Sequence, residues 1–112
     1  IFLKKVADPE RFGVVTLGKN GGVVRIEEKP KKPKSDLAVV GLYFYDTTVF
    51  EKMRDQNPSK RGEYEITYVN NKYLKEGKLK AVVLKKKWTD IGTFDSLVDT
   101  SYHVRKNAKK RR

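Results

Sequence analysis

The alternation of apolar and polar positions divides the first third of the chain into short strands. Strands are predicted over residues 13–17 and 23–27, and the glycine-rich segment Gly18–Gly22 joins them. Asn20-Gly21 supplies residues that readily take the positive φ angles of tight hairpin turns. This pattern predicts a β-hairpin, preceded by the end of another strand near Phe2.

A nearly unbroken apolar run over Leu37–Tyr45 follows a short loop rich in proline and lysine. A strand that is apolar on both faces is typical of the centre of a sheet, where both faces are covered. A further strand is predicted over residues 79–84. These strands are expected to share one sheet.

Two helices are predicted between the strands at residues 37–45 and 79–84. The first starts with the sequence Thr48-Val49-Phe50-Glu51, which matches a capping box, and ends at Pro58. The second ends at Gly77. The apolar faces of the two helices are expected to hold Val49, Phe50 and Met53 in the first, and Ile66, Val69, Tyr73 and Leu74 in the second.

A last helix is predicted to begin at Thr93, a suitable N-cap residue. Its apolar positions are expected to face the core: Phe94, Leu97, Val98 and Tyr102. Residues 1–106 are then one α/β domain, and residues 107–112 are expected to form a basic flexible tail. His103 lies on this helix without a partner nearby in sequence, which favours a structural role.

The charge balance favours anionic partners, because the chain has 26 lysine and arginine residues but only 14 acidic ones, and its net charge is +12. Nucleic acid, nucleotides and phosphorylated metabolites all qualify. Most of the excess lies in Lys29–Lys34, Lys85–Lys87 and Arg105–Arg112, and such clusters are commonly solvated loops or tails. A non-catalytic basic α/β domain that binds nucleic acid or another polyanion is therefore one hypothesis, although no nucleic-acid motif supports it.

The sequence has no cysteine, no apolar run of membrane-spanning length and no signal-peptide pattern at its start. These features predict a soluble, cytoplasmic protein without disulfides or a membrane partner. The chain begins at Ile1 in the middle of an apolar pattern, which indicates a piece of a longer chain.

Candidate chemistry lies at two places. In Glu27-Glu28-Lys29-Pro30 an acid–base pair stands at the end of a strand and is followed by proline. Asp90 is expected between a strand end and a helix N-terminus, where anionic ligands and their metals often bind. The alternatives are a surface ion pair for Glu28 and Lys29 and a helix-terminal charge for Asp90.

Five blocks carry a family resemblance: Asp8–Val15, Glu27–Pro30, Gly41–Asp46, Arg61–Thr67 with Val69–Asn71, and Trp88–Thr93. In this order and spacing they resemble the sugar-1-phosphate nucleotidylyltransferases, over almost all of residues 6–102. The resemblance implies a partial Rossmann-like nucleotidyltransferase core with a mixed β-sheet, a β-hairpin and about three helices.

The resemblance also implies a reaction. In this family a phosphate oxygen of a sugar 1-phosphate attacks the α-phosphorus of a nucleoside triphosphate, and pyrophosphate leaves with the assistance of Mg²⁺. The product is an NDP-sugar, here expected to be dTDP-glucose. A positioned lysine and a carboxylate-held metal suit phosphoryl transfer, which depends on positioning and charge neutralisation.

The resemblance assigns roles to single residues. Gly13 would lie against the sugar, Glu28 would accept hydrogen bonds from its hydroxyls, and Lys29 would hold its phosphate. The remaining positions are Val39 and Tyr43 in the sugar pocket, Arg61 and Glu63 at its rim, and Asp90 as one of two metal-binding aspartates. Lys29 and Asp90 are thus the candidate catalytic residues, expected to converge on one concave site.

Departures from the family pattern limit these expectations. The family's opening glycine-rich phosphate loop, with Gly-Thr-Arg-Leu, and its first metal aspartate do not occur here, and Tyr68 stands where an aspartate is expected. The chain is therefore interpreted as a C-terminal, sugar-binding portion that is inactive alone. Because strand 37–45 should be covered on both faces, self-association or pairing with a missing N-terminal half is expected.

Overall fold

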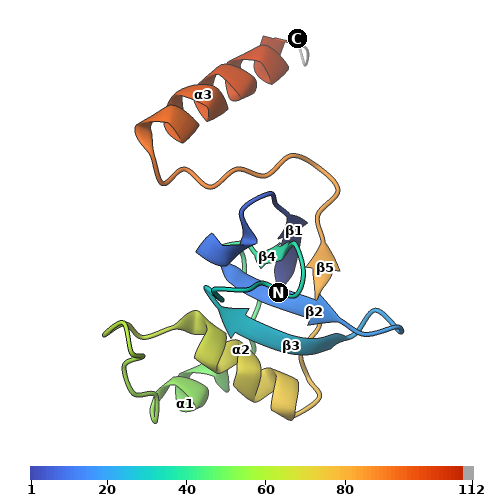
Figure 1. Cartoon of the computed structure of the whole chain (residues 1–112), viewed down its shortest axis with the longest axis vertical. Coiled ribbons are helices and arrows are strands. Elements are labelled where there is room, and N and C mark those ends of the chain that lie inside the picture. Colours follow the sequence, from blue (N-terminus) through green and yellow to red (C-terminus); the bar gives the residue numbers. More distant parts are fainter. Residues whose placement is uncertain (110–112) are drawn as a thin grey trace.

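A five-stranded sheet forms the body of the protein in the computed structural model, which describes residues 1–109 (Figure 1). The order across the sheet is β3-β2-β4-β1-β5. The strands are β1 (Phe2–Lys5), β2 (Gly13–Leu17), β3 (Val23–Glu28), β4 (Leu37–Val39) and β5 (Val82–Val83). A single 3₁₀ turn, η1 (Pro9–Arg11), follows β1, and the helices are α1 (Val49–Met53), α2 (Ile66–Lys75) and α3 (Phe94–Lys109). The predicted mixed α/β fold is confirmed.

The sheet is mixed because β5 runs parallel to β1 while the other neighbours are antiparallel. The β2–β3 hairpin is present as predicted, and Gly21 in its turn has φ of 77°. Left-handed backbone of this kind costs glycine little because it has no Cβ.

The central strand is shorter than the sequence predicts. β4 occupies the middle of the sheet, as expected for a segment apolar on both faces, but it ends at Val39 instead of Tyr45. The Val40 amide still donates to the Phe2 carbonyl at 3.0 Å, and the Leu42 amide then turns back to the Val40 carbonyl at 2.7 Å. This tight turn, an i to i+2 bond, directs the chain out of the sheet toward α1.

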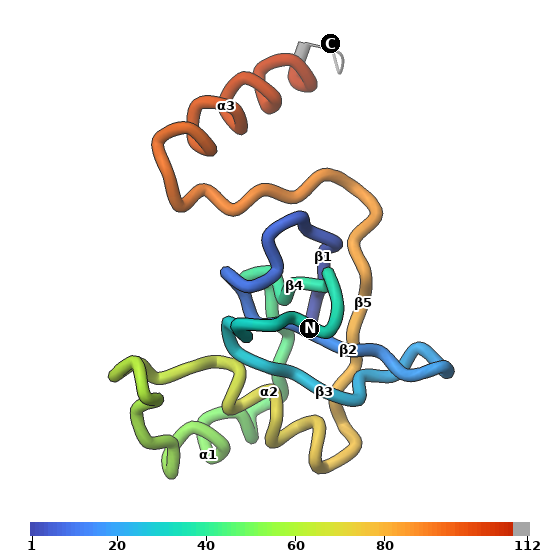
Figure 2. The backbone as a smooth tube through the Cα atoms, in the orientation of Figure 1, coloured from blue at the N-terminus to red at the C-terminus, as the bar shows by residue number. Residues whose placement is uncertain are grey.

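Two apolar clusters hold the body together. One joins the strands through buried Ile1, Leu3, Val15, Ile26 and Val39. The other lies between α1 and α2 and holds buried Val49, Val69 and Tyr73. Figure 2 shows α2 running alongside β3, so the helix covers the β2–β3 side of the sheet.

The first helix departs from its predicted face and cap. Phe50 and Met53 are exposed, and only Val49 of the predicted face is buried. Thr48 makes no capping bond to the helix; its amide and hydroxyl both donate to the Asp46 carboxylate, at 3.0 and 2.5 Å. With five residues, α1 is too short for a full apolar stripe, which explains the difference.

The last helix projects from the body (Figure 1). Thr93 caps it as predicted, since Ser96 N–H donates to Thr93 Oγ1 at 3.2 Å. The inward orientation predicted for its apolar side chains is wrong: Phe94, Leu97, Val98 and Tyr102 are exposed. His103 contacts Asn107 at 2.9 Å on the same helix.

Of the tail expected at residues 107–112, residues 107–109 continue α3, and residues 110–112 lie outside the described part of the chain. Within residues 1–109, no helix combines the length and apolar character needed to cross a membrane.

Candidate functional site

A cavity of about 180 Å³ opens where β2, β3, β4 and α2 meet. It brings together five of the residues assigned from the sequence. Its lining consists of Gly13, Glu28, Lys29, Val39 and Tyr43, with Arg11, Phe12, Ile66 and Thr67. A larger cavity, of about 330 Å³, lies against the chain end at Ile1 and holds none of the assigned residues, so we place the site in the smaller one.

Strand register explains why these residues meet. Gly13 stands opposite Glu28 in the antiparallel β2–β3 ladder, and Val14 stands opposite Ala38 in the β2–β4 pair. The start of β2 therefore lies between the end of β3 and the end of β4. Residues far apart in sequence reach one edge of the sheet, where the chain leaves it after Glu28 and after Val39.

Gly13 is required by close packing. A Cβ atom at this position would stand 3.2 Å from Thr67 Oγ1, 3.3 Å from Glu28 Oε2 and 3.6 Å from Val39 Cγ2. Contacts of 3.2 Å to a carbon atom are tighter than ordinary van der Waals packing. The glycine thus keeps the floor of the cavity open.

The Glu28 carboxylate is held from two sides. Thr67 Oγ1 donates a short hydrogen bond to Oε2, and Arg61 Nη1 lies 3.8 Å from Oε1. The Glu28 side chain is 23% exposed and lines the cavity, so its carboxylate remains accessible to a molecule bound there. An oriented, ionisable carboxylate of this kind is a strong acceptor for paired hydroxyl groups.

Lys29 has an unusual backbone conformation. Its φ of 40° places a non-glycine residue in the left-handed region, while its amide donates to the Phe12 carbonyl at 3.0 Å. Such a conformation costs of order 1–3 kcal/mol and clusters at functional sites. The exposed Lys29 lines the same cavity as Glu28.

Arg61 and Glu63 lie beside the cavity without lining it. The Arg61 guanidinium contacts Glu63 Oε2 at 2.8 Å and Glu65 Oε1 at 3.4 Å, in addition to Glu28. Arg61 therefore reaches the cavity only through Glu28, and Glu63 only through Arg61. The rim role predicted for both residues remains a prediction.

Tyr43 forms an aromatic wall. Its ring stacks on Tyr45 with centroids 5.7 Å apart, and Tyr45 stacks in turn on Tyr73 at 5.5 Å. Burial raises the pKa of the Tyr43 hydroxyl, and the nearby negative charge of Glu28 raises the same pKa further. The phenol therefore keeps its proton to a higher pH than an exposed tyrosine and is available as a hydrogen-bond donor.

Asp90 lines a different cavity from the two described above, also of about 330 Å³. This Asp90 cavity shares Arg11 and Phe12 with the cavity that Glu28 and Lys29 line. Arg11 Nη2 lies 3.9 Å from Asp90 Oδ2, and Arg11 Nη1 lies 2.8 Å from Asp8 Oδ2. The hydrogen bond and charge of Asp8 raise the pKa of Arg11, and Asp90 adds to this effect. Asp90 is thus a neighbour of the Glu28–Lys29 cavity, separated from it by Arg11 and Phe12.

The acidic side chains of the described residues do not form a metal site by themselves. Within residues 1–109, no group of three or more His, Cys, Asp or Glu side chains could hold an ion. Asp90 offers one carboxylate that is 47% exposed. Mg²⁺ is often bound by one or two carboxylates together with water and substrate phosphates. A magnesium ion at Asp90 would therefore need further ligands from water and a bound phosphate.

Two residues of the site were not identified from the sequence. Thr67 orients Glu28, and Arg11 lies between the two cavities. Thr67 occupies the first turn of α2 beside the apolar position Ile66, where a threonine carries no distinct signal. Arg11 appeared only within the motif block Asp8–Val15. Contacts between distant segments are needed to detect either role.

The family model described as nucleotidyl transferase matches residues 1–107. The chain therefore belongs to the nucleotidyl transferase family.

Within that family the chain is similar to proteins named glucose-1-phosphate thymidylyltransferase. One from Mycolicibacterium smegmatis is 53% identical over 107 residues, which are 94% of this chain and 37% of that protein. One from Neisseria meningitidis is 46% identical over 106 residues, 93% of this chain and 37% of that protein. This chain thus spans little more than a third of the length of these relatives.

A solved structure gives the same likeness. It is a Bacillus anthracis protein named for the same activity, in complex with sucrose, and it superposes with a TM-score of 0.82 at 47% identity. The match covers 93% of this chain and 42% of the other. The fold around the cavity is thus the fold of this family.

Proposed function

We propose that this chain forms the sugar-phosphate-binding part of a nucleotidylyltransferase that makes an NDP-sugar from a sugar 1-phosphate and a nucleoside triphosphate. The observation that carries the proposal is the single cavity lined by Glu28, Lys29 and Gly13 in a chain of this family. We propose glucose 1-phosphate as the sugar phosphate and dTDP-glucose as the product, because the similar proteins are named for that reaction.

The side chains suit the two ends of a sugar phosphate. The Glu28 carboxylate, fixed by Thr67, would accept hydrogen bonds from neighbouring sugar hydroxyls. The Lys29 ammonium would neutralise the phosphate and hold the oxygen that attacks the α-phosphorus of the nucleotide. In that step a new P–O bond forms and the bond to pyrophosphate breaks, so no proton donor is needed for the leaving group when it departs ionised.

Asp90 would complete the charge balance. Asp90 would be a ligand of Mg²⁺, which would supply charge stabilisation for the transferring phosphoryl group. Arg11, 3.9 Å from the Asp90 carboxylate, provides a fixed positive charge at the same boundary between the cavities. Asp90 and Lys29 would thus approach the reacting phosphates from the two cavities.

Turnover is proposed to need more than these residues. The relatives are more than twice as long as the matched segment, which is 37% of their length. We propose that the triphosphate is held by sequence beyond these 112 residues, in the same polypeptide or in a paired chain. Self-association would also cover the exposed apolar side chains of α3.

Calorimetric titration of the full chain with glucose 1-phosphate tests the proposal. Saturable binding is expected, with a loss of at least about tenfold in Lys29→Ala, the effect of one lost charge-assisted hydrogen bond. Lys32→Ala is the matched control, because Lys32 is an exposed lysine in the adjacent basic loop. Equal losses in both variants, or binding of an oligonucleotide in place of the sugar phosphate, would contradict the proposal and favour a general polyanion-binding domain.

A further inference from the structure

The segment that carries Asp90 leaves the sheet with little backbone support. β5 pairs with β1 only at Val82 and Val83, and the Leu84 amide extends this ladder by one bond to the Leu3 carbonyl, at 2.8 Å. Residues 85–93 then run outside any helix or strand to α3. Figure 1 shows this extended stretch above the sheet. Side chains must therefore set its position.

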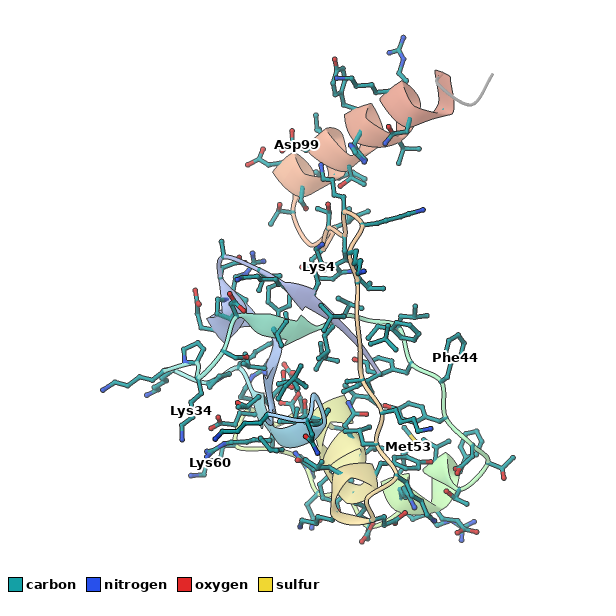
Figure 3. The ribbon with its side chains drawn as sticks, turned by 90° about the vertical axis from the view of Figure 1, so that its right-hand side faces the viewer. Lys4, Lys34, Phe44, Met53, Lys60 and Asp99 are labelled. Carbon is teal, nitrogen blue, oxygen red and sulfur yellow. The ribbon has the colours of Figure 1, made fainter. Side chains whose placement is uncertain are left out.

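Lys4 supplies the missing support. Its Nζ atom donates to three successive carbonyls, those of Leu84 at 3.2 Å, Lys85 at 3.4 Å and Lys86 at 2.8 Å. An ammonium group has three N–H donors and no acceptor, so these contacts use its full capacity. Figure 3 shows Lys4 beside the extended segment that leads to α3.

The contacts run against the local charge. Lys85, Lys86 and Lys87 surround the same stretch, and like charges repel. A lysine with no specific role would extend into solvent and away from this cluster. Lys4 is instead half-buried against the main chain, where carbonyl dipoles offset the repulsion.

The supported segment reaches the site within a few residues. Trp88 packs edge to face on Phe12, with centroids 5.8 Å apart, and Asp90 approaches Arg11. Phe12 and Arg11 line both cavities. The large apolar side chains of α3 are exposed and only Ser96 of this helix lines the Asp90 cavity, so the helix adds little support from the other end.

We propose that Lys4 is a positioning residue whose ammonium clamps the carbonyls of residues 84–86 and thereby places Trp88 and Asp90 beside the sugar-phosphate cavity. Its importance for the reaction rests on the proposed function. The clamp itself is a structural claim that can be tested without any ligand.

Trp88 is the only tryptophan in the chain, so its fluorescence reports on this segment directly. In Lys4→Met the apolar stem remains and the donors are lost. The emission of Trp88 is expected to shift to the red and acrylamide quenching to increase, because the indole leaves Phe12 for water. Lys5→Met is the matched control: Lys5 also lines the Asp90 cavity, but its ammonium pairs with Asp36 at 3.0 Å.

Binding provides a second readout. Lys4→Met is expected to keep the wild-type affinity for glucose 1-phosphate without metal, because Glu28 and Lys29 do not depend on the segment. Adding Mg²⁺ is expected to increase this affinity about tenfold less in Lys4→Met than in the wild type. A tenfold effect is about the size expected for one charge-assisted hydrogen bond. A general loss of structure would weaken both affinities together.

These outcomes separate the two proposals. If the wild-type chain binds no glucose 1-phosphate, the proposed function fails while the Trp88 spectra still test Lys4. If Lys4→Met, folded by circular dichroism, has the wild-type emission and quenching, the clamp is refuted. Should Lys4→Met not fold, Lys4→Gln, which keeps an amide donor, takes its place in the same comparison with Lys5→Met.

Discussion

Thr67 Oγ1 donates a hydrogen bond to Glu28 Oε2 and so ties the first turn of α2 to the end of β3. The bond fits because Gly13 has no side chain at the same point, where a Cβ would stand 3.2 Å from the threonine hydroxyl. Glu28 Oε1 faces Arg61 instead, at 3.8 Å. The two oxygens of one carboxylate thus have different partners, which fixes the plane that it presents to the cavity.

Replacing Thr67 by valine preserves the shape and removes the donor. Thr67→Val is expected to weaken glucose 1-phosphate binding about tenfold and to lower the free energy of unfolding by about 1–3 kcal/mol, because a poorly solvated carboxylate loses its partner. Calorimetry and urea unfolding measure the two effects. Thr47→Val, at an exposed threonine, is the control. An unchanged affinity in Thr67→Val would show that Glu28 needs no orientation.

A methyl group at Gly13 would enter the floor of the cavity. Gly13→Ala is expected to cost about 1–3 kcal/mol in stability through overpacking and to abolish measurable sugar-phosphate binding. Gly41→Ala is a sharp control, since a Cβ at Gly41 meets nothing within 4 Å. Thermal unfolding and titration of both variants check this. Equal behaviour of the two would mean that the close approach at Gly13 has no functional weight.

The backbone of Lys29 allows function and strain to be separated. Lys29→Gly is expected to be more stable than Lys29→Ala by up to about 2 kcal/mol, because only glycine relieves the cost of a positive φ. Both variants should lose sugar-phosphate binding, since both lack the ammonium. Urea unfolding gives the stability difference. If the alanine variant proves the more stable, the φ of 40° is not a strained conformation in solution.

The raised pKa of Tyr43 has a consequence at high pH. The unfolded tyrosine loses its proton near the ordinary value of 10.0, before the folded one does. The folded state then holds more protons than the unfolded state, so stability falls as pH rises above about 10. In Tyr43→Phe the free energy of unfolding, measured with urea, is expected to fall less steeply between about pH 9 and 11. The difference in slope should correspond to about one titrating group. Parallel curves for variant and wild type would assign the fall to other groups, such as the lysines.

Local signals in the sequence predicted the parts of the fold that local interactions specify. The hairpin turn at Gly18–Gly22 and the end of α2 at Gly77 both depend on glycines in short-range turns, and both are present. The predicted length of β4 was wrong because the strand ends in a turn after Val40, whose amide bonds to the Phe2 carbonyl of the neighbouring strand. A local pattern does not reveal this contact. The apolar positions of α3 predicted a packed helix, but packing needs a partner that helical periodicity does not identify.

In the candidate site, too, some residues could be predicted from local motifs and others depend on contacts between distant segments. Gly13, Glu28 and Lys29 could be assigned from ordered motifs, and the β2–β3 register brings them together. Asp90 lies in the adjoining cavity, because the connection from β5 passes along Lys4 before it reaches Arg11. That route depends on an ammonium contacting the main chain 82 residues away in sequence, which no motif encodes.

The extended connection between β5 and α3 divides the site into parts of unequal local stability. Glu28 stands on a paired strand beside buried Ile26, whereas Asp90 stands on a stretch held by side chains alone. Amide protons of residues 87–91 should therefore exchange with solvent by a small opening that leaves the hairpin intact. The part of the cavity that stands on the β2–β3 hairpin is therefore expected to stay assembled during this opening, because its residues belong to a paired ladder.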